Sequence, residues 1–313
     1  MTVTRSRASW LALVAMLAGS GGASLAQSAG DAQSAPPLSV CMSEDNAPLS
    51  MARKGRLSGF DVVMAEAVAR ELGRPLRLVP FESELESDAN FAIEVNALLS
   101  AGACDLVSGF PLLSGDLSAP RRASAKTPDF PGAKRPPERP LIPLGQLVAS
   151  QPYQGMALQL VQRMDAPPAN ALGELSGQKI GAVAGTLGGT LVATFNGGAL
   201  VPQMVSLARN EDPWAAMASG RIDAMLVPTT AWDVVRKRQG DALRLRAGEP
   251  LSLGVNLGWV ALADMAPLVD AVNRVVAREA DLQQWAQAAA LQRLKPTSPA
   301  VVGSLTVTAL LAK

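Results

Sequence analysis

The stretch GFDVVMAEAVARELG, residues 59–73, has a pattern of apolar residues that indicates the fold class of the chain around it. Apolar residues recur in it at steps of three and four, which is the spacing of one helix face. They are Phe60, Val63, Met64, Ala67, Val68 and Leu72. Gly73 stands where helices commonly end in a left-handed residue. The stretch therefore predicts an amphipathic helix that ends at Gly73.

Short apolar segments on either side of this helix predict strands. They are LSVCM (38–42), LRLVPF (76–81) and CDLVSGF (104–110), and a second helix is expected over NFAIEVNALLSAG (90–102). Strands that alternate with helices favour a parallel sheet with right-handed crossovers. The predicted fold class is α/β.

A second unit repeats this order. We expect a strand over residues 178–185, a glycine turn and helix over 185–195, a strand over 200–207, a short helix over 212–220 with Asp212 as N-cap, and a strand over 221–228. AGACDLVSGF (101–110) and ASGRIDAMLVP (218–228) are close counterparts, which indicates two similar lobes. The tail predicts a strand over 253–263 and one or two amphipathic helices over 267–294.

The composition excludes several classes of site. The 313 residues include no histidine and two cysteines. This excludes Ser-His-Asp and Cys-His catalysis, histidine-ligated zinc or haem, and four-cysteine zinc or iron–sulfur sites. Carboxylate chemistry and oxygen-ligated Ca²⁺ or Mg²⁺ stay open. No carboxylate pair has a spacing that nominates a hydrolase, and the acidic run over residues 82–88 lacks EF-hand spacing. We therefore expect no metal and no cofactor, and a cation site at this run is the alternative.

The N-terminus has the pattern of a secretory signal peptide. Arg5 and Arg7 precede the apolar run WLALVAMLA (10–18), and the small residues ASLA (23–26) precede a cut at Gln27. Nine apolar residues are too few for a bilayer span, which needs about 20. We expect a cleaved signal peptide over 1–26, a flexible leader over 27–37, a periplasmic location and no stable membrane insertion. The alternative is an N-terminal membrane anchor.

The charge of the mature chain argues against nucleic acid as a partner. Removing residues 1–26 takes away two of the 28 basic residues and none of the 27 acidic ones, which leaves a formal charge of −1. A nucleic-acid-binding protein normally carries a basic excess.

The two cysteines can form one disulfide. An exported chain meets an oxidising compartment, and Cys41 and Cys104 both belong to predicted strand segments. A bond between them requires that these segments are neighbours, with a Cα separation of about 5.5 Å. The alternative is two inert buried thiols.

Candidate binding residues follow the strands. Ligands of open parallel sheets sit outside the carboxyl ends of the strands, and two facing lobes would bring these ends to one cleft. The turn GTLGGT (185–190) allows close backbone approach and offers free N–H groups, although its glycines could equally serve a tight turn only. The candidates are Asp45, Asn46, Phe81, Ser108, Phe110, Thr186, Gly188, Gly189, Thr190 and Thr229.

Residues 114–145 interrupt the α/β order. This segment contains seven prolines, six basic residues and three acidic ones. Proline excludes a long regular helix or a central strand there. The segment is either a solvated loop or a protrusion that docks an acidic partner.

Several motifs together resemble a known family. GRLSGFDVVMAEAVARELG, NALLSAGACDLVSGF and LSGQKIGAVAGTLGG occur in the order typical of family 3 solute-binding proteins, the type II periplasmic binding proteins of ABC importers. The resemblance covers most of residues 38–285. It implies a two-lobed fold, each lobe a mixed, mainly parallel sheet flanked by helices, joined by two hinge strands. Lobe 1 would comprise residues 38–147 plus 254–313, and lobe 2 residues 148–253.

The chain departs from that family's amino-acid binders. These carry an arginine soon after the third-strand signature, where this chain has FPLLSGDLSAPRR (110–122) with Arg121 and Arg122 displaced. Pro228 and Thr229 stand where the resemblance expects an aspartate. We therefore expect a monomeric, non-enzymatic solute-binding protein whose ligand is not a standard α-amino acid and whose partner is an ABC permease.

Two alternatives stay open. Some divergent members of the family accompany periplasmic quinoprotein dehydrogenases such as methanol dehydrogenases, and Cys41, Cys104 and the basic insertion resemble that group. The chain would then dock a dehydrogenase or cytochrome. The other alternative is a periplasmic enzyme on the same scaffold, which would need a cleft carboxylate with a raised pKa.

Overall fold

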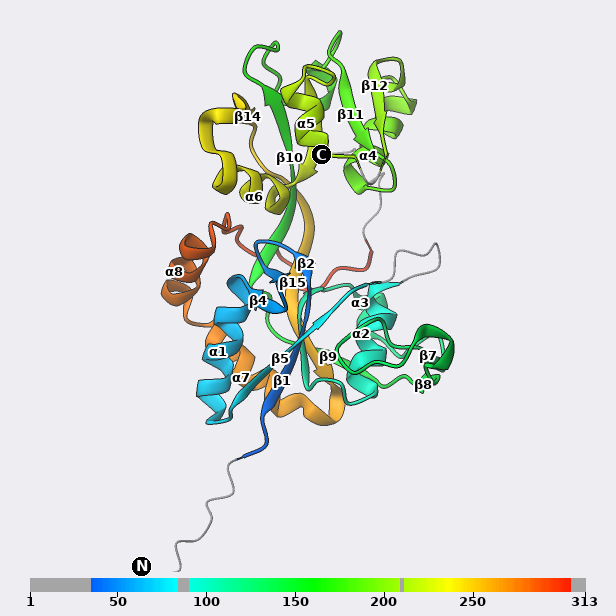
Figure 1. Cartoon of the computed structure of the whole chain (residues 1–313), viewed down its shortest axis with the longest axis vertical. Helices are drawn as coiled ribbons and strands as arrows, with labels where there is room; N and C mark the ends of the chain where they lie inside the picture. The colour runs from blue at the N-terminus through cyan, green and yellow to red at the C-terminus, as the bar shows by residue number, and fades with distance from the viewer. Residues whose placement is uncertain (1–34, 84–89, 209–210, 305–313) are drawn as a thin grey trace, which may run out of the picture. The chain divides into compact units, whose positions relative to one another are not determined.

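The computed structural model describes residues 35–83, 90–208 and 211–304 (Figure 1). The predicted signal peptide and residues 27–34 of the predicted leader lie outside the described residues. None of the helices in the described part has both the length and the apolar character that a membrane span requires.

One ten-stranded sheet organises the described chain (Figure 1). Its main strand order is β12-β11-β13-β10-β15-β6-β1-β5, and β14 and β9 pair with β10 and β15 respectively. The bounds are β1 (Leu38–Ser43), β5 (Leu76–Phe81), β6 (Leu106–Pro111), β9 (Leu147–Ala149), β10 (Gln154–Arg163), β11 (Ile180–Val183), β12 (Met204–Leu207), β13 (Ala224–Pro228), β14 (Leu245–Ala247) and β15 (Leu251–Leu262).

The first half of the sheet is built on β1, which pairs in parallel with β5 and β6. Helices cover both of its faces because β1 is apolar on both sides. Val40 and Met42 pack under α1 (Phe60–Leu72), α7 (Ala266–Val276) and α8 (Glu279–Ala289), whereas Cys41 faces α2 (Phe91–Ser100). This alternation follows the two-residue period of a strand. Gly73 ends α1 with a φ of 61°, as the sequence predicts.

The second half repeats this arrangement with β11, β12 and β13, which pair in parallel. One face packs against α4 (Leu187–Thr194), and the other against α5 (Pro213–Ala218) and α6 (Thr229–Gln239). Asp212 caps α5 by accepting hydrogen bonds from the backbone N–H groups of Trp214 and Ala215, which confirms its predicted role.

Two long strands, β10 and β15, connect the halves and pair antiparallel to each other (Figure 1). On one side β10 pairs with β13, and on the other β15 pairs with β6. The sequence pattern predicts β15 but misses both β10 and α6. The lobe boundaries proposed at residues 147 and 253 stay predictions.

Cys41 and Cys104 form a disulfide with a Cα separation of 5.7 Å. The pairing is possible because β1 and β6 are neighbours, with Cys41 opposite Val107 in the register. Cys104 itself lies just before β6, and not within the strand as predicted. The predicted disulfide is confirmed.

Short elements complete the described chain. A three-stranded hairpin sheet follows β1, with β2 (Asp45–Asn46), β3 (Ser50–Arg53) and β4 (Arg56–Ser58). The proline-rich segment holds only a four-residue helix α3 (Ser114–Leu117) and the two-residue strands β7 (Ser124–Ala125) and β8 (Ile142–Pro143), together with one turn of 3₁₀ helix. Arg139 is buried there and donates hydrogen bonds to Asp129 and to the carbonyl of Lys134.

Candidate functional site

A cavity of about 420 Å³ opens at the carboxyl ends of β1, β5, β6 and β13, and we call it the cleft pocket. Ser43, Ser83, Pro111 and Pro228 contribute from these four strand ends. β10 and β15 add lining residues where they cross between the halves. The cavity thus lies at the sheet edge where the parallel order places a ligand.

The polar lining of the cleft pocket comes from both halves. Asp45 and Asn46 lie on β2, directly after β1, and Thr229 and Thr230 open helix α6. Gln154 at the start of β10 also lines the pocket, with its side chain held by Gln292 and Arg293. Among the described lining residues Asp45 is the only charged one.

An aromatic cluster forms part of the apolar wall. Phe91, the first residue of α2, lines the cavity, and its ring centroid lies 6.1 Å from those of Phe81 and Phe110. Phe81 and Phe110 are buried behind it and do not line the pocket. The two predicted phenylalanines therefore support the wall, while Phe91 presents the surface.

A buried polar pair lies behind the pocket wall. The Tyr153 hydroxyl donates a hydrogen bond of 3.0 Å to Oδ2 of Asp61, and both residues are fully buried. Burial raises the pKa of Asp61 to about 6, against the lowering effect of the hydroxyls of Tyr153 and Ser108. Ser108 is buried beside this pair, not in the pocket lining. The raised-pKa carboxyl is therefore not a cavity residue.

The glycine turn is occupied by its own contacts. Thr186 caps α4 by accepting from the N–H of Gly189, and the Thr190 hydroxyl donates to the Thr186 carbonyl. A Cβ at Gly188 would overlap the Leu226 carbonyl, and one at Gly189 would lie 2.5 Å from the Val183 carbonyl oxygen. These glycines therefore permit close packing of α4 on the sheet.

The structure brings three of the ten predicted binding residues, Asp45, Asn46 and Thr229, together in the cleft pocket. The other seven lie outside its lining, so a binding role for them stays a prediction. Sequence reasoning missed Phe91, Leu187 and Gln154. Leu187 lies inside the GTLGGT turn, directly after a predicted strand, so its position was an available signal. Phe91 and Gln154 offered no such local signal.

Many solved structures are similar to this chain, and two of them illustrate the likeness. One is the second substrate-binding domain of a putative amino acid ABC transporter from Streptococcus pneumoniae Canada MDR_19A, with 13% identity, a TM-score of 0.55, and coverage of 80% of this chain and 98% of that one. The other is an ancestral arginine-binding protein bound to arginine, with 16% identity, a TM-score of 0.51, and coverage of 80% and 97%. This chain has a periplasmic-binding-protein fold.

The predicted architecture is confirmed. The chain has mainly parallel half-sheets that are flanked by helices and joined by two long strands, as in the similar structures. No protein-family model and no curated protein matches the sequence. At such low identities the likeness concerns the fold alone.

Proposed function

We propose that this chain is a divergent solute-binding protein of the family 3 type, exported to the periplasm, that captures a small solute in the cleft pocket for an ABC importer. The observation that carries the proposal is the cavity of about 420 Å³, lined from both halves of the sheet. Its size suits a small molecule. Because β10 and β15 connect the halves, closure around the solute would proceed by hinge motion.

The lining supports a solute other than a standard α-amino acid. An α-carboxylate needs a cation or several strong donors when it leaves water. No lysine or arginine occurs among the described residues that line the cleft pocket. Asp45 supplies the charge, and most of the remaining lining is apolar. The pocket therefore favours a neutral or weakly cationic solute with an apolar body.

The test is ligand capture by the mature protein. Native mass spectrometry of protein isolated gently from its own periplasm should detect a retained small molecule. The same compound should then raise the melting temperature, because ligand at a hundredfold excess over Kd stabilises by about 2.7 kcal/mol. Leu187→Trp, which places a larger side chain in the lining of the cleft pocket, should reduce the shift. The absence of any shift across a broad panel of neutral, cationic and amino-acid solutes would contradict the proposal.

The second candidate function is that of an accessory protein that docks a periplasmic quinoprotein dehydrogenase or its cytochrome. The observation that favours it is the charge of the insertion, which exposes Arg121, Arg122, Lys126, Lys134 and Arg135. Deletion of residues 116–143 should abolish co-purification with such a partner and leave the fold intact. Retained co-purification after the deletion would remove this role from the insertion.

A further inference from the structure

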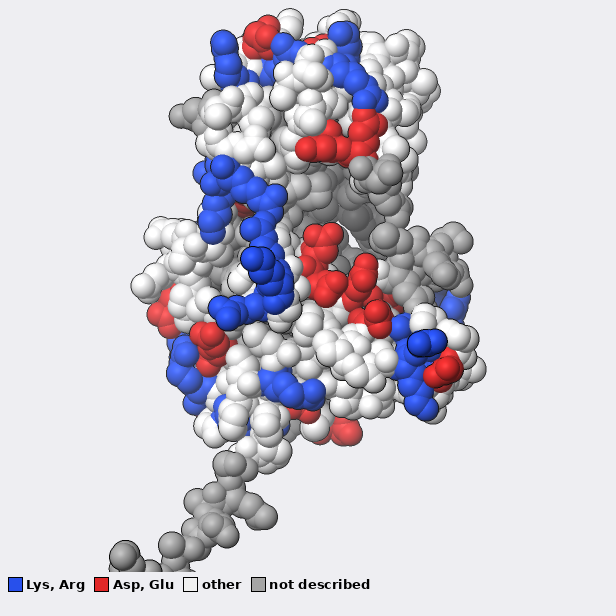
Figure 2. Space-filling view, viewed as in Figure 1, with Lys and Arg blue, Asp and Glu red and all other residues white. Residues whose placement is uncertain are grey.

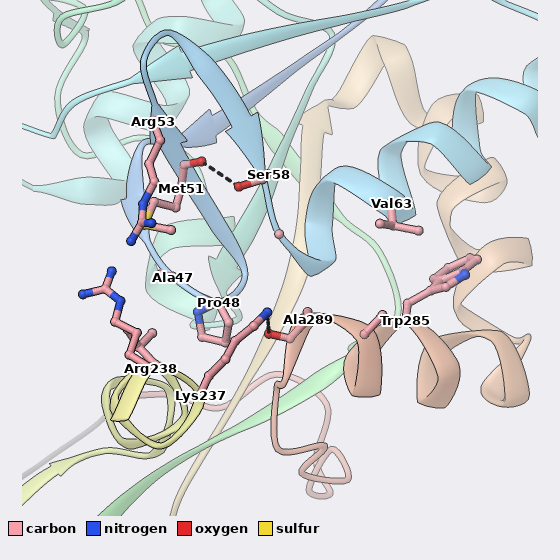
Figure 3. Close-up of a pocket in the computed structure, with 13 residues that line it drawn as sticks. Ala47, Pro48, Met51, Arg53, Ser58, Val63, Lys237, Arg238, Trp285 and Ala289 are labelled. Atoms are coloured by element: carbon pink, nitrogen blue, oxygen red, sulfur yellow. Dashed lines mark hydrogen bonds between the residues drawn. The ribbon is translucent and has the colours of Figure 1, made fainter. Parts of the chain in front are cut away.

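A second cavity, of about 540 Å³, lies between the β2–β4 hairpin, α1, α6 and α8 (Figure 3), and we call it the basic pocket. Arg53 on β3 contributes from the first half of the sheet, and Lys237 and Arg238 contribute from the last turn of α6 in the second half. The turn between β2 and β3 separates it from the cleft pocket, with Ala47 and Pro48 on one side and Asn46 and Leu49 on the other.

The charge of the basic pocket is of one sign. Its lining holds three cationic side chains and, among the described residues, no carboxylate. Lys237 Nζ donates to the Ala289 carbonyl, whereas the side chains of Arg53 and Arg238 have no hydrogen-bond or ion-pair partner within the described part of the chain. Their guanidinium groups point toward one another in Figure 3. The two positive charges repel each other, and together they attract an anion.

The same cations form part of a wider basic surface. Figure 2 shows a band of lysine and arginine that crosses between the two halves. Arg53, Lys54 and Arg56 on the hairpin are all exposed, as are Lys237 and Arg238. These charges therefore attract an approaching anion to the mouth of the pocket. Dissolved salt screens this attraction and so shortens its range.

The opposite end of the basic pocket is apolar. Trp285 and Val63 lie there, away from Arg53 and Arg238 (Figure 3), and Met51 and Pro48 also line the cavity. An aromatic or aliphatic body placed against Trp285 would leave water, while an acidic group at the other end would meet the two guanidinium groups. The pocket therefore has separate places for the two parts of one small molecule.

We propose that the basic pocket binds an amphipathic organic anion, with its acidic group held by Arg53 and Arg238 and its apolar body against Trp285. Such a ligand contacts both halves of the sheet and neutralises the repulsion between Arg53 of the first half and Arg238 of the second. It therefore favours the approach of the two halves. The proposal goes beyond capture of a solute in the cleft pocket and assigns a second site to the chain. The apolar end, where Trp285 and Val63 are half-buried, favours a small molecule over an acidic protein, which would need only the exposed band.

The test uses 2-naphthoate as the anionic probe and 2-naphthamide as its neutral counterpart, titrated into the mature protein by calorimetry. Naphthoate should bind, and the amide should bind at least about tenfold more weakly, a difference of about 1.4 kcal/mol. Naphthoate affinity should also fall as salt rises. Failure of naphthoate to bind at millimolar concentration, or equal affinity for the amide, overturns the proposal.

Variants locate the probe. Arg238→Glu should weaken naphthoate binding at least about tenfold, whereas Arg135→Glu, an equal charge change on the exposed insertion, should leave it unchanged. Leu187→Trp, which alters the lining of the cleft pocket and not that of the basic pocket, should also leave it unchanged, and this separates the site from the proposed function. Unchanged binding in Arg238→Glu with an intact melting temperature overturns the proposal. Binding of hexaglutamate in place of naphthoate also overturns it and identifies the basic band as a docking surface for an acidic protein.

Discussion

The hydroxyl of Tyr153, the residue before β10, donates a hydrogen bond of 3.0 Å to Oδ2 of Asp61 in the first turn of α1. The Tyr153 ring also stacks on Phe60, with centroids 5.8 Å apart. A Cβ at Gly109, in the cleft-pocket wall, would lie 3.4 Å from the same Asp61 oxygen. The pair thus anchors a connecting strand directly behind the candidate site.

The Asp61 carboxyl makes stability depend on pH. Burial raises its pKa from 3.8 to about 6 in the folded protein, so between these values the folded state binds more protons than the unfolded state. Its contribution is fully favourable below about pH 4 and is lost as pH rises through about 6, which amounts to about 3 kcal/mol. The Asp61→Asn variant lacks this titration. Its free energy of unfolding, relative to that of the natural protein, should therefore be higher at pH 8 than at pH 5.

Urea denaturation gives the free energy of unfolding of both proteins at pH 5 and pH 8. The effect is the change between these pH values in the natural protein minus the change in the variant. Other titrating groups contribute equally to both proteins and cancel. An Asp61→Asn variant whose stability follows pH as steeply as the natural protein would show that Asp61 does not titrate in this range.

Tyr153→Phe removes one hydroxyl and keeps the aromatic stack on Phe60. Oδ1 of Asp61 has no hydrogen-bond partner among the described residues. The variant also removes the hydrogen bond that Oδ2 accepts from Tyr153. We expect a loss of about 1–3 kcal/mol at pH 8 and a smaller loss at pH 5, where protonation relieves the buried charge. Combining Tyr153→Phe with Asp61→Asn should cost less than the sum of the two single changes. Additive costs in that double variant would contradict a direct interaction.

The elements with one clear apolar face could be predicted from the sequence. The helix over residues 59–73 and the strand ends that border the cleft pocket follow from local periodicity and parallel order. β10 escaped prediction because its sequence, QGMALQLVQR, places glutamines where a buried strand is expected to be apolar. Gln159 and Gln162 are buried through hydrogen bonds to the carbonyls of Gly248 and Pro167, which are tertiary contacts.

The buried pair could not be found from local pattern for the same reason. Asp61 has the position of an ordinary acidic residue in a helix first turn, where an exposed carboxylate is favourable. Its burial depends on Tyr153, 92 residues away. Likewise, Phe91 has the spacing of a core residue, and only the placement of α2 beside the strand ends makes it part of the cavity wall.

Gly188→Ala tests whether the glycine turn serves packing. The added Cβ would overlap the Leu226 carbonyl, so α4 has to move away from β13. Overpacking of this kind costs about 1–3 kcal/mol. Gly115→Ala is the matched control because nothing lies within 4 Å of its Cβ position. Thermal unfolding should separate the two variants, and an unchanged melting temperature for Gly188→Ala would assign the glycine to something other than close packing.

The disulfide should stabilise the protein chiefly through the unfolded chain. Cys41 and Cys104 are 63 residues apart in sequence, and a loop of this length corresponds to about 4 kcal/mol in the chain-entropy model. Protein reduced in denaturant and refolded with its thiols blocked from reoxidation should have a free energy of unfolding, measured with urea, that is lower by that amount. The native bond should resist mild reductant, because both cysteines are buried. Detection of two free thiols in the denatured, unreduced protein would contradict the pairing, and equal stability of the two forms would show that the bond adds no net stability.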